Sequence, residues 1–192
     1  MTTWETRGSL NSFNDEQLMH AVQENDVTKL GILFERHHKS LYNFFYRWFR
    51  NGETSEDLVQ EVFCRILKYR HTYSAGQPFL AWFFRIAHNV GNDYFRTSPK
   101  ELPLAEDYDP ASRIDPQEKV QNRMALEQLE KALNQLDPEK RELVILCRFH
   151  NLKYKQIAKI LGCSVAAIKV RLHRALKELS LGYRQDIKET AS

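Results

Sequence analysis

Cysteine and long apolar runs are both scarce in this sequence, and each shortage excludes a class of protein. Three cysteines occur in 192 residues, an odd number that indicates a reducing compartment rather than a secreted disulfide framework. No apolar run approaches the ~20 residues that a membrane-spanning helix needs. The N-terminus also lacks the basic stretch and apolar run of a signal peptide. We therefore expect a soluble, cytoplasmic protein with no membrane insertion.

Motifs for catalysis and for metal or cofactor binding are missing as well. The sequence has no glycine-rich phosphate-binding loop and no recognisable pair of a nucleophile and a base. His37 and His38 are neighbours on an expected helix, so their side chains point about 100° apart. Cys147 and His150 lack the second ligand pair that would complete a tetrahedral site. We expect no catalytic residue, no metal and no cofactor, and hence no enzyme.

Net charge is small over the whole chain but is distributed unevenly. The formal net charge is +3 at pH 7. Residues 138–181 alone hold ten lysines and arginines against three glutamates, a net charge of +7. A local excess of this size favours a polyanion as the partner of the C-terminal part.

Strand signals are scarce, whereas apolar residues recur with a 3.6-residue period through most of the chain. This periodicity predicts an all-α fold. Asn14 and Gln17 form a capping-box pattern for the first helix. Asn51 and Gly52 are expected to end the second helix, and Ser55 to cap the third. The expected helices cover residues 14–24, 27–50, 55–73, 79–96, 120–136 and 138–149, followed by a helix pair within 152–179.

Proline is concentrated in one segment that separates two helical parts. Four of the six prolines lie within residues 98–117, where acidic residues also outnumber basic ones. The segment has too few apolar residues to offset the entropy of ordering it, so we interpret it as a flexible linker. The sequence thus predicts two small helical domains, residues 10–97 and 118–184, joined by an acidic, proline-rich linker.

The last two expected helices are separated by a tight turn, Gly162-Cys163-Ser164. Glycine can adopt a positive φ angle at the end of the first helix, and Ser164 can accept an amide hydrogen bond at the start of the second. Two short helices joined in this way match a helix-turn-helix motif. The apolar stripe expected to face the first helix is Val165, Ile168, Leu172, Ala175, Leu176 and Leu179.

The opposite face of the second helix is basic, which suits DNA, although a solvated basic face is the plain alternative. Val170 can contact a thymine methyl group, while Lys169 or Arg174 can reach guanine acceptors. Arg171, at the edge of the face, is better placed for phosphate. The residues expected to contact duplex DNA are Ser164, Ala166, Lys169, Val170, Arg171, His173, Arg174 and Lys177.

The segments SEDLVQEVFCRIL and FLAWFFRIAHNVGNDYFR, together with LEKALNQLDPEKRELVILCRF and the helix-turn-helix, resemble bacterial sigma factors of the extracytoplasmic-function (ECF) type. The resemblance extends from Asn14 to Leu181. It implies a sigma-2 domain at 10–97 that binds core RNA polymerase and the −10 promoter element, and a sigma-4 domain at 118–184 whose helix-turn-helix reads the −35 element. It also implies the polymerase-binding residues Asp57, Gln60, Glu61 and Phe63, and the −10-binding residues Tyr73, Ser74, Ala75, Asn89, Asn92, Asp93 and Arg96.

The function implied by this resemblance is promoter-specific transcription initiation, with core RNA polymerase, promoter DNA and an anti-sigma factor as partners. The alternative is a stand-alone helix-turn-helix regulator whose N-terminal domain senses a ligand or dimerises. That alternative predicts tight DNA binding without polymerase.

Some residues of the N-terminal half leave open questions. Most of its aromatic residues are expected in the core, with Tyr73 or Tyr94 as the exception that touches nucleic acid. Gly91 interrupts a helix and either allows DNA to approach or loosens the helix. His88 and His173 are expected to face DNA, which predicts stronger binding as the pH falls.

Overall fold

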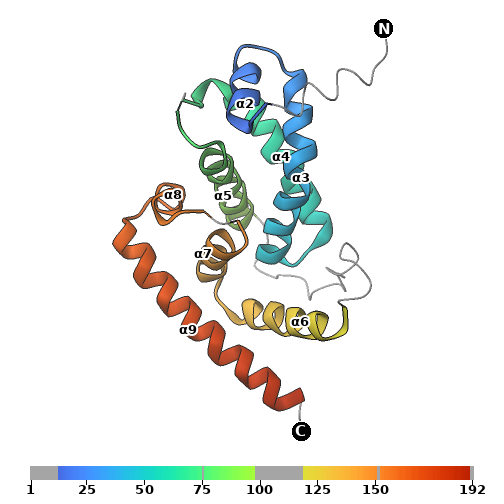
Figure 1. The fold of residues 1–192 in the computed structure, drawn as a ribbon, viewed down its shortest axis with the longest axis vertical. Helices are drawn as coiled ribbons and strands as arrows, with labels where there is room; N and C mark the ends of the chain where they lie inside the picture. The colour runs from blue at the N-terminus through green and yellow to red at the C-terminus, as the bar shows by residue number, and fades with distance from the viewer. Residues whose placement is uncertain (1–12, 75, 98–118, 151, 191–192) are drawn as a thin grey trace.

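The computed structural model describes residues 13–74, 76–97, 119–150 and 152–190, and these residues form eight α-helices and one short 3-10 helix, with no strand among them (Figure 1). The all-α prediction is confirmed. The predicted linker, 98–117, lies outside the described residues. No described helix is long and apolar enough to cross a lipid bilayer. The elements are α2 (Asp15–Gln23), α3 (Thr28–Phe49), α4 (Gly52–Tyr69), η1 (Arg70–Thr72), α5 (Phe79–Thr97), α6 (Lys119–Gln135), α7 (Pro138–Arg148), α8 (Tyr154–Ile160) and α9 (Val165–Thr190).

The start of α2 follows the predicted capping box. Asn14 Oδ1 accepts a hydrogen bond from the Gln17 backbone N–H at 2.8 Å, and Gln17 Oε1 accepts one from the Asn14 backbone N–H at 2.9 Å. At the other end of the fold, α9 continues to Thr190, past the predicted domain boundary at residue 184.

The prediction that Ser55 caps α4 is wrong. Arg50 adopts a left-handed conformation, with φ 59°, and ends α3. Asn51 then caps α4, because its Oδ1 accepts a hydrogen bond from the Thr54 backbone N–H at 2.7 Å. Ser55 lies one turn inside the helix, fully buried, and its hydroxyl donates to the Asn51 carbonyl. The sequence alone did not reveal that a non-glycine residue would take the left-handed position.

Helices α2 to α5 form the first half of the molecule around an aromatic core. Phe44, Phe45 and Phe49 on one face of α3 pack against α4 and α5, together with Phe79 and Phe83 of α5. The ring centroids of Phe44 and Phe84 lie 5.3 Å apart at an edge-to-face angle, an arrangement that aromatic pairs prefer. The prediction that most aromatic residues of this half are core residues is confirmed.

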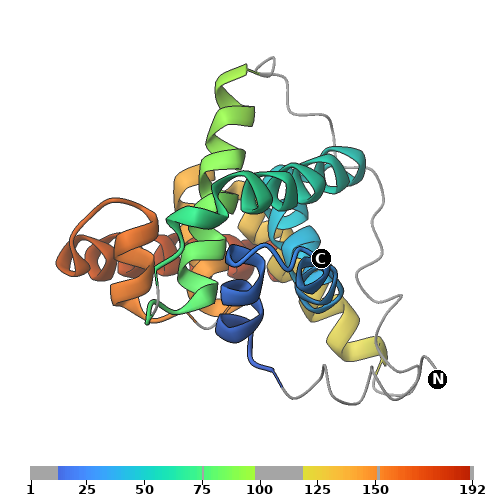
Figure 2. The same cartoon turned by 90° about the horizontal axis from the view of Figure 1, so that it is seen from above.

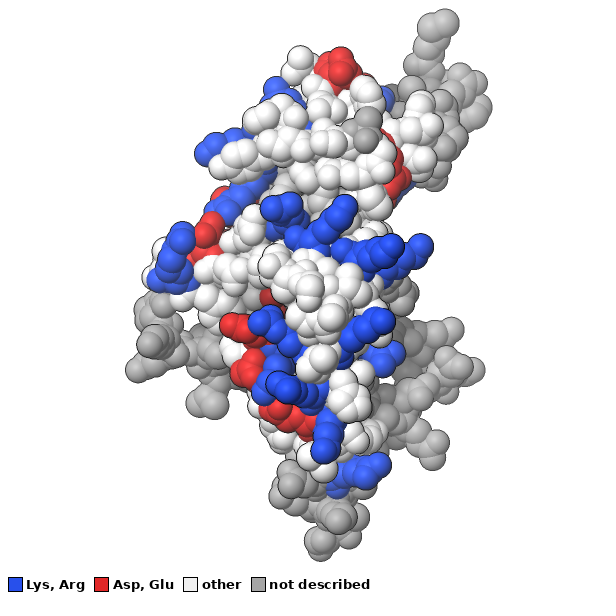
Figure 3. Space-filling model, turned by 90° about the vertical axis from the view of Figure 1, so that its left-hand side faces the viewer, with Lys and Arg blue, Asp and Glu red and all other residues white. Residues whose placement is uncertain are grey.

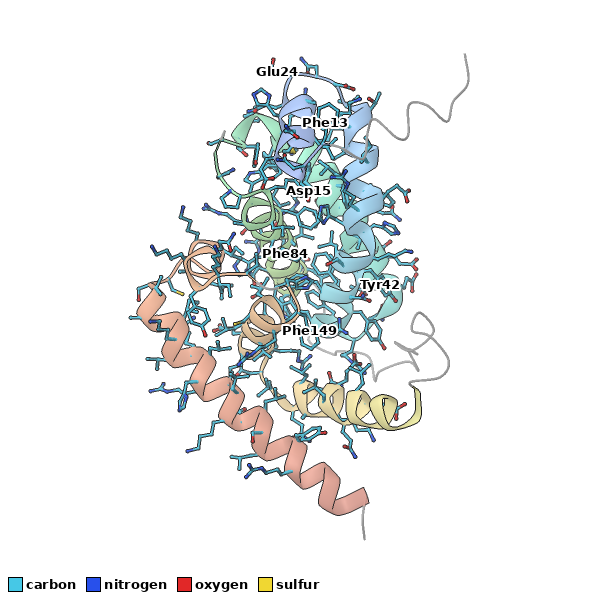
Figure 4. All side chains as sticks on the ribbon, viewed as in Figure 1. Phe13, Asp15, Glu24, Tyr42, Phe84 and Phe149 are labelled. Atoms are coloured by element: carbon cyan, nitrogen blue, oxygen red, sulfur yellow. The ribbon has the colours of Figure 1, made fainter. Side chains whose placement is uncertain are left out.

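Helices α6 to α9 form the second half, which packs directly on the first. Helix α7 contacts α3, and α8 contacts α5. Figure 2 shows α8 and the start of α9 on one side of the first four helices. Phe84 and Phe149, labelled in Figure 4, lie near this junction. Buried residues of both halves belong to one continuous hydrophobic cluster, so the halves share a core in this structure.

Charged side chains cross the junction as well. Arg141 of α7 donates a hydrogen bond through Nη1 to the carbonyl of Trp48 in α3, at 3.0 Å. Glu130 of α6 pairs with Arg50 at 2.8 Å between Oε2 and Nη1. Glu142 pairs with His88 of α5 at 2.7 Å between Oε1 and Nδ1. Arg141, Glu130 and Glu142 are all buried, so these contacts fix how the halves meet.

His150 gives the junction a predicted sensitivity to acid. Its ring lies against Phe44 and Phe84, and burial, with a smaller effect from Arg47, lowers the pKa of His150 to about 4. Between pH 6.5 and 4 the imidazole of His150 is therefore protonated in the unfolded chain but neutral in the folded chain. The free energy of unfolding consequently falls as the pH falls. The loss is expected to reach about 3 kcal/mol.

The measurement is chemical denaturation of the protein at pH 7 and at pH 4.5. His150→Phe should remove most of the difference between the two values, whereas His20→Gln, at an exposed position, should keep it. An unchanged acid sensitivity in His150→Phe would assign it to other groups.

Candidate functional site

The helix-turn-helix forms as the sequence predicts. Helix α8 ends at Ile160, and Gly162 follows with φ 63°, in the left-handed region. Ser164 Oγ accepts a hydrogen bond from the Ala167 backbone N–H at 3.1 Å, which caps α9. Both turn residues therefore have their predicted roles, because each depends only on the chain within a few residues of it.

The two faces of α9 also agree with the prediction. Ile168, Leu172, Ala175 and Leu179 are buried toward the other helices of this half. Val170 is 52% exposed although it is apolar, which is the exposure that a contact with a thymine methyl group requires. The residues of the predicted DNA-reading set, all exposed, are Ser164, Ala166, Lys169, Val170, Arg171, His173, Arg174 and Lys177.

The face of the molecule that carries α8 and α9 is rich in lysine and arginine (Figure 3). Helix α8 adds Lys155 and Lys159, both exposed, and Lys153 precedes it. Acidic side chains neutralise one member of this face, because Lys140 Nζ lies 2.8 Å from Asp137 Oδ2 and 2.9 Å from Glu178 Oε2. The remaining cations can attract a phosphate backbone.

One edge of α4 carries the acidic set that was expected to bind a protein. Asp57, Gln60 and Glu61 are exposed along this edge, where residues three and four apart are neighbours. Phe63 is different: it is 7% exposed and packs between Phe34 and Phe83. The structure places Phe63 in the core, where it packs α4 against α3 and α5 and is not available to a partner.

A cavity of about 650 Å³ lies beside α5, next to the loop after η1. Asn89, Asn92 and Asp93 contribute to its wall, so the structure brings together three of the predicted −10 residues. Tyr69 and Trp82 supply aromatic rings to the same cavity. Arg96 lies on the same helix and is exposed.

The loop itself is held by a buried tyrosine. Tyr73 is 4% exposed, packs on Trp82 and Phe79, and donates its hydroxyl to the Gln77 carbonyl at 2.8 Å. Burial raises the pKa of Tyr73 to about 12. In this conformation its ring anchors the loop and cannot stack on a base. Ser74 is exposed, whereas Ala75 lies outside the described residues.

Two expectations for α5 need correction. His88 is only partly exposed, with 18% of its side chain accessible, and it is not free to bind DNA in this arrangement, because its Nδ1 pairs with Glu142 of α7 and its ring stacks on Trp48. Gly91 is buried, and a Cβ atom there would lie 2.2 Å from Cζ3 of Trp48. The absence of a side chain at Gly91 thus makes room for the indole ring of Trp48 and not for DNA. The sequence pattern missed both contacts because the partners are more than 40 residues away.

A second groove, of about 860 Å³, runs between α5, α7 and α9. Asn92 of α5 lines it together with Arg171 and Arg174 of α9. Residues predicted to read two separate DNA elements therefore lie on one groove in this arrangement of the halves.

Comparison with known proteins identifies a sigma-factor region in each half of the chain. The family model for Sigma-70 region 2 matches residues 33–100, and that for Sigma-70 region 4 matches residues 126–179. The RNA polymerase sigma factor CarQ of Myxococcus xanthus is 31% identical over 77% of this chain and 84% of its own length. The ECF RNA polymerase sigma factor SigE of Mycolicibacterium smegmatis is 32% identical over 83% of this chain, which spans 63% of that longer protein.

Two solved structures share the fold. CnrH, in complex with the cytosolic domain of CnrY, is 24% identical with a TM-score of 0.69, covering 90% of this chain and 98% of that one. The sigma factor RpoE of Bartonella quintana, in complex with the anti-sigma factor NepR, is 24% identical with a TM-score of 0.67, covering 80% of this chain and 96% of that one. The chain belongs to the ECF sigma factors of RNA polymerase. A stand-alone regulator is not favoured, because both halves match sigma regions.

Proposed function

We propose that this chain is a non-catalytic specificity subunit that acts in the cytoplasm and directs core RNA polymerase to its promoters. The observation that carries the proposal is the pairing of two surfaces on one chain. An exposed basic helix in a helix-turn-helix suits duplex DNA, and an exposed acidic edge on α4 suits a protein partner. Neither surface initiates transcription without the other.

The −35 element would be read by α9 in the major groove. Its exposed N-terminal part carries Lys169 and Val170, which suit guanine acceptors and a thymine methyl group. Arg171, at the edge of the face, would bind phosphate. Arg174, one turn further on, is the residue expected to contribute most to base reading, because arginine pairs bidentately with guanine.

The −10 element would be held on α5 and in the cavity beside it. Extruding a base from a duplex costs a few kcal/mol, which stacking and base-edge contacts must offset. Tyr69 and Trp82 in the cavity provide aromatic surface, and Asn89 and Asn92 provide amide groups. Tyr73 would serve indirectly by holding the loop that closes this side.

The acidic edge of α4 would dock on the polymerase. Asp57, Gln60 and Glu61 present two carboxylates and an amide within one turn, and carboxylates form strong hydrogen bonds with arginine. Phe63 would contribute only by packing beneath them.

An anti-sigma factor is the further partner that we propose. Both fold neighbours described above were solved as complexes with another protein, in one case named an anti-sigma factor. The cavity and groove beside α5 offer concave surface for such a partner.

The halves would have to separate when a promoter is bound. Elements centred near −10 and −35 are ~25 base pairs apart, which corresponds to roughly 85 Å of B-form DNA. Asn92 and Arg174 line the same groove here, so this closed arrangement cannot reach both elements. Weak DNA binding by the isolated chain is the expected consequence.

The test of this proposal is in vitro transcription with bacterial core polymerase, with and without this protein, on a library of genomic upstream fragments. Specific transcripts that depend on the protein support the proposal. Failure to associate with core polymerase, or tight operator binding by the chain alone, would contradict it.

Two sets of substitutions should have reciprocal effects. Asp57→Ala combined with Glu61→Ala is expected to weaken core polymerase binding about tenfold and leave duplex −35 recognition intact. Arg174→Ala is expected to reduce −35-dependent initiation about tenfold and leave core binding intact. Pull-down with core polymerase and transcription from a promoter found in the screen measure the two effects.

Matched controls are available outside the two proposed binding surfaces. Glu35→Ala removes an exposed carboxylate from α3, away from the acidic edge of α4, and Arg184→Ala removes an exposed cation near the end of α9. Neither control should change either measurement. Equal loss of both activities in either test variant would refute the division of labour.

A further inference from the structure

Arg65 of α4 bridges the two functional surfaces of the first half. Its Nε lies 2.6 Å from Glu61 Oε1, and its Nη1 lies 2.7 Å from Asp93 Oδ2 of α5. Glu61 belongs to the acidic edge proposed to dock on polymerase, and Asp93 belongs to the proposed −10 face. No sequence pattern singled out Arg65, because its second partner lies 28 residues away.

The bridge is part of a longer chain of alternating charges. Arg96 Nη2 lies 2.8 Å from Asp93 Oδ1, so each oxygen of the Asp93 carboxylate accepts from a different arginine. Arg65 likewise uses different nitrogen atoms for its two carboxylates. Hydrogen bonds therefore connect, in this order, Glu61, Arg65, Asp93 and Arg96, from the acidic edge of α4 to the end of α5.

Asp93 poses a problem for a surface that holds a DNA strand. A carboxylate on that surface repels phosphate groups unless a cation neutralises it. The hydrogen bond from Arg65 lowers the pKa of Asp93, so this carboxylate stays charged. Arg65 is only partly exposed, with 26% of its side chain accessible, whereas the Arg96 side chain is 77% exposed. Arg65 is thus the inner counter-ion, and Arg96 is the one free to turn toward DNA.

We propose that Arg65 is a positioning residue that couples polymerase docking to −10 binding: it neutralises Asp93 and so leaves Arg96 available for the DNA backbone. This inference rests on the proposed function, because it takes the roles of α4 and α5 from there. When a cation of the polymerase pairs with Glu61, Arg65 loses one of its two partners and binds Asp93 alone. Asp93 then needs Arg96 less, and Arg96 can pair with phosphate.

The test measures binding of the holoenzyme to a forked DNA that carries the −10 element of a promoter from the transcription screen. Arg65→Ala is expected to weaken this binding about fivefold, as for the loss of one partly exposed ion pair. Arg65→Lys should lose less affinity for the forked DNA, since its single ammonium group can still reach Asp93. The double variant Arg65→Ala with Asp93→Asn should regain most of the loss, because the unpaired carboxylate is gone.

The rescue separates this role from others. Asp93→Asn alone is the reference, because removing a carboxylate near DNA favours phosphate binding in any background. If Asp93→Asn strengthens binding as much in the wild type as in Arg65→Ala, Arg65 does not act through Asp93 and the inference is overturned. Unchanged binding in Arg65→Ala would overturn it equally. Lys39→Ala, which removes an exposed cation elsewhere in the first half, should leave binding within twofold of the wild type.

Core affinity distinguishes failure of this inference from failure of the proposed function. A wild-type chain that does not bind core polymerase rejects the proposed function itself. If the wild-type holoenzyme binds the forked DNA but the Arg65→Ala and double variants do not follow the pattern above, only this inference is rejected. Melting temperatures of all variants are measured alongside, and a loss of binding that only follows a loss of folding would overturn the inference.

Discussion

Gly91→Ala is expected to lower the free energy of unfolding by about 3 kcal/mol, because one added methyl group has no room. The new Cβ would lie 2.2 Å from Cζ3, 2.7 Å from Cη2 and 2.9 Å from Cε3 of Trp48. The indole ring is 2% exposed and packs against Phe44, Phe49 and Phe95, so it cannot move aside without disturbing the core. Chemical denaturation followed by circular dichroism measures the change.

The sign of this effect is informative because helix propensity acts in the opposite direction. Alanine is better than glycine inside a helix by about 1 kcal/mol. At Gly31, also within a helix, a Cβ would meet nothing within 4 Å, so Gly31→Ala should stabilise the protein. Equal stabilisation by both substitutions would contradict the packing argument. Trp48→Leu combined with Gly91→Ala should recover part of the loss by making space.

The packing of Gly91 also matters for function. Gly91 lies between Asn89 and Asn92, which the proposal assigns to the −10 element. Close contact between α5 and α3 holds this stretch of α5 in place. Gly91→Ala is therefore expected to impair −10 binding through misplacement of α5 and not through loss of a DNA contact.

Arg141→Leu is the second substitution with a large expected effect, a destabilisation of about 4 kcal/mol. The guanidinium group of Arg141 is buried and donates to four backbone carbonyls, those of Leu133, Trp48, Asn134 and Leu136, at 2.7–3.0 Å. Leucine fills similar space but leaves these carbonyls without a donor. A loss below 1 kcal/mol in denaturation would show that water or other groups replace the arginine.

Arg148→Leu is the matched control, because Arg148 lies on the same helix but is exposed. Its effect should stay within about 0.5 kcal/mol. Arg141 also joins the end of α6 to the end of α3, so Arg141→Leu should loosen the two halves from each other. Proteolysis at the junction of the halves is expected to be faster in this variant than in the control.

Much of the fold was accessible from the sequence because helix formation is a local property. Asn14 and Ser164 cap their helices, and Gly162 takes a positive φ angle, as the pattern predicts. The buried and exposed faces of α9 also follow from the 3.6-residue period alone. The exposed basic face that is proposed to read DNA could be predicted for the same reason, since it lies on one continuous helix.

The tertiary structure decided whatever depended on residues distant in the chain. Phe63 and Tyr73 carry side chains that suit a surface contact, yet both are buried by helices that the periodicity could not place. His88 meets Glu142, and Gly91 meets Trp48, across distances of more than 40 residues in sequence. Arg65 reaches Asp93 only because α4 and α5 lie side by side. Local hydrogen bonding sets each helix and its faces, whereas the pairing of those faces depends on side-chain shape and charge brought together by the whole fold.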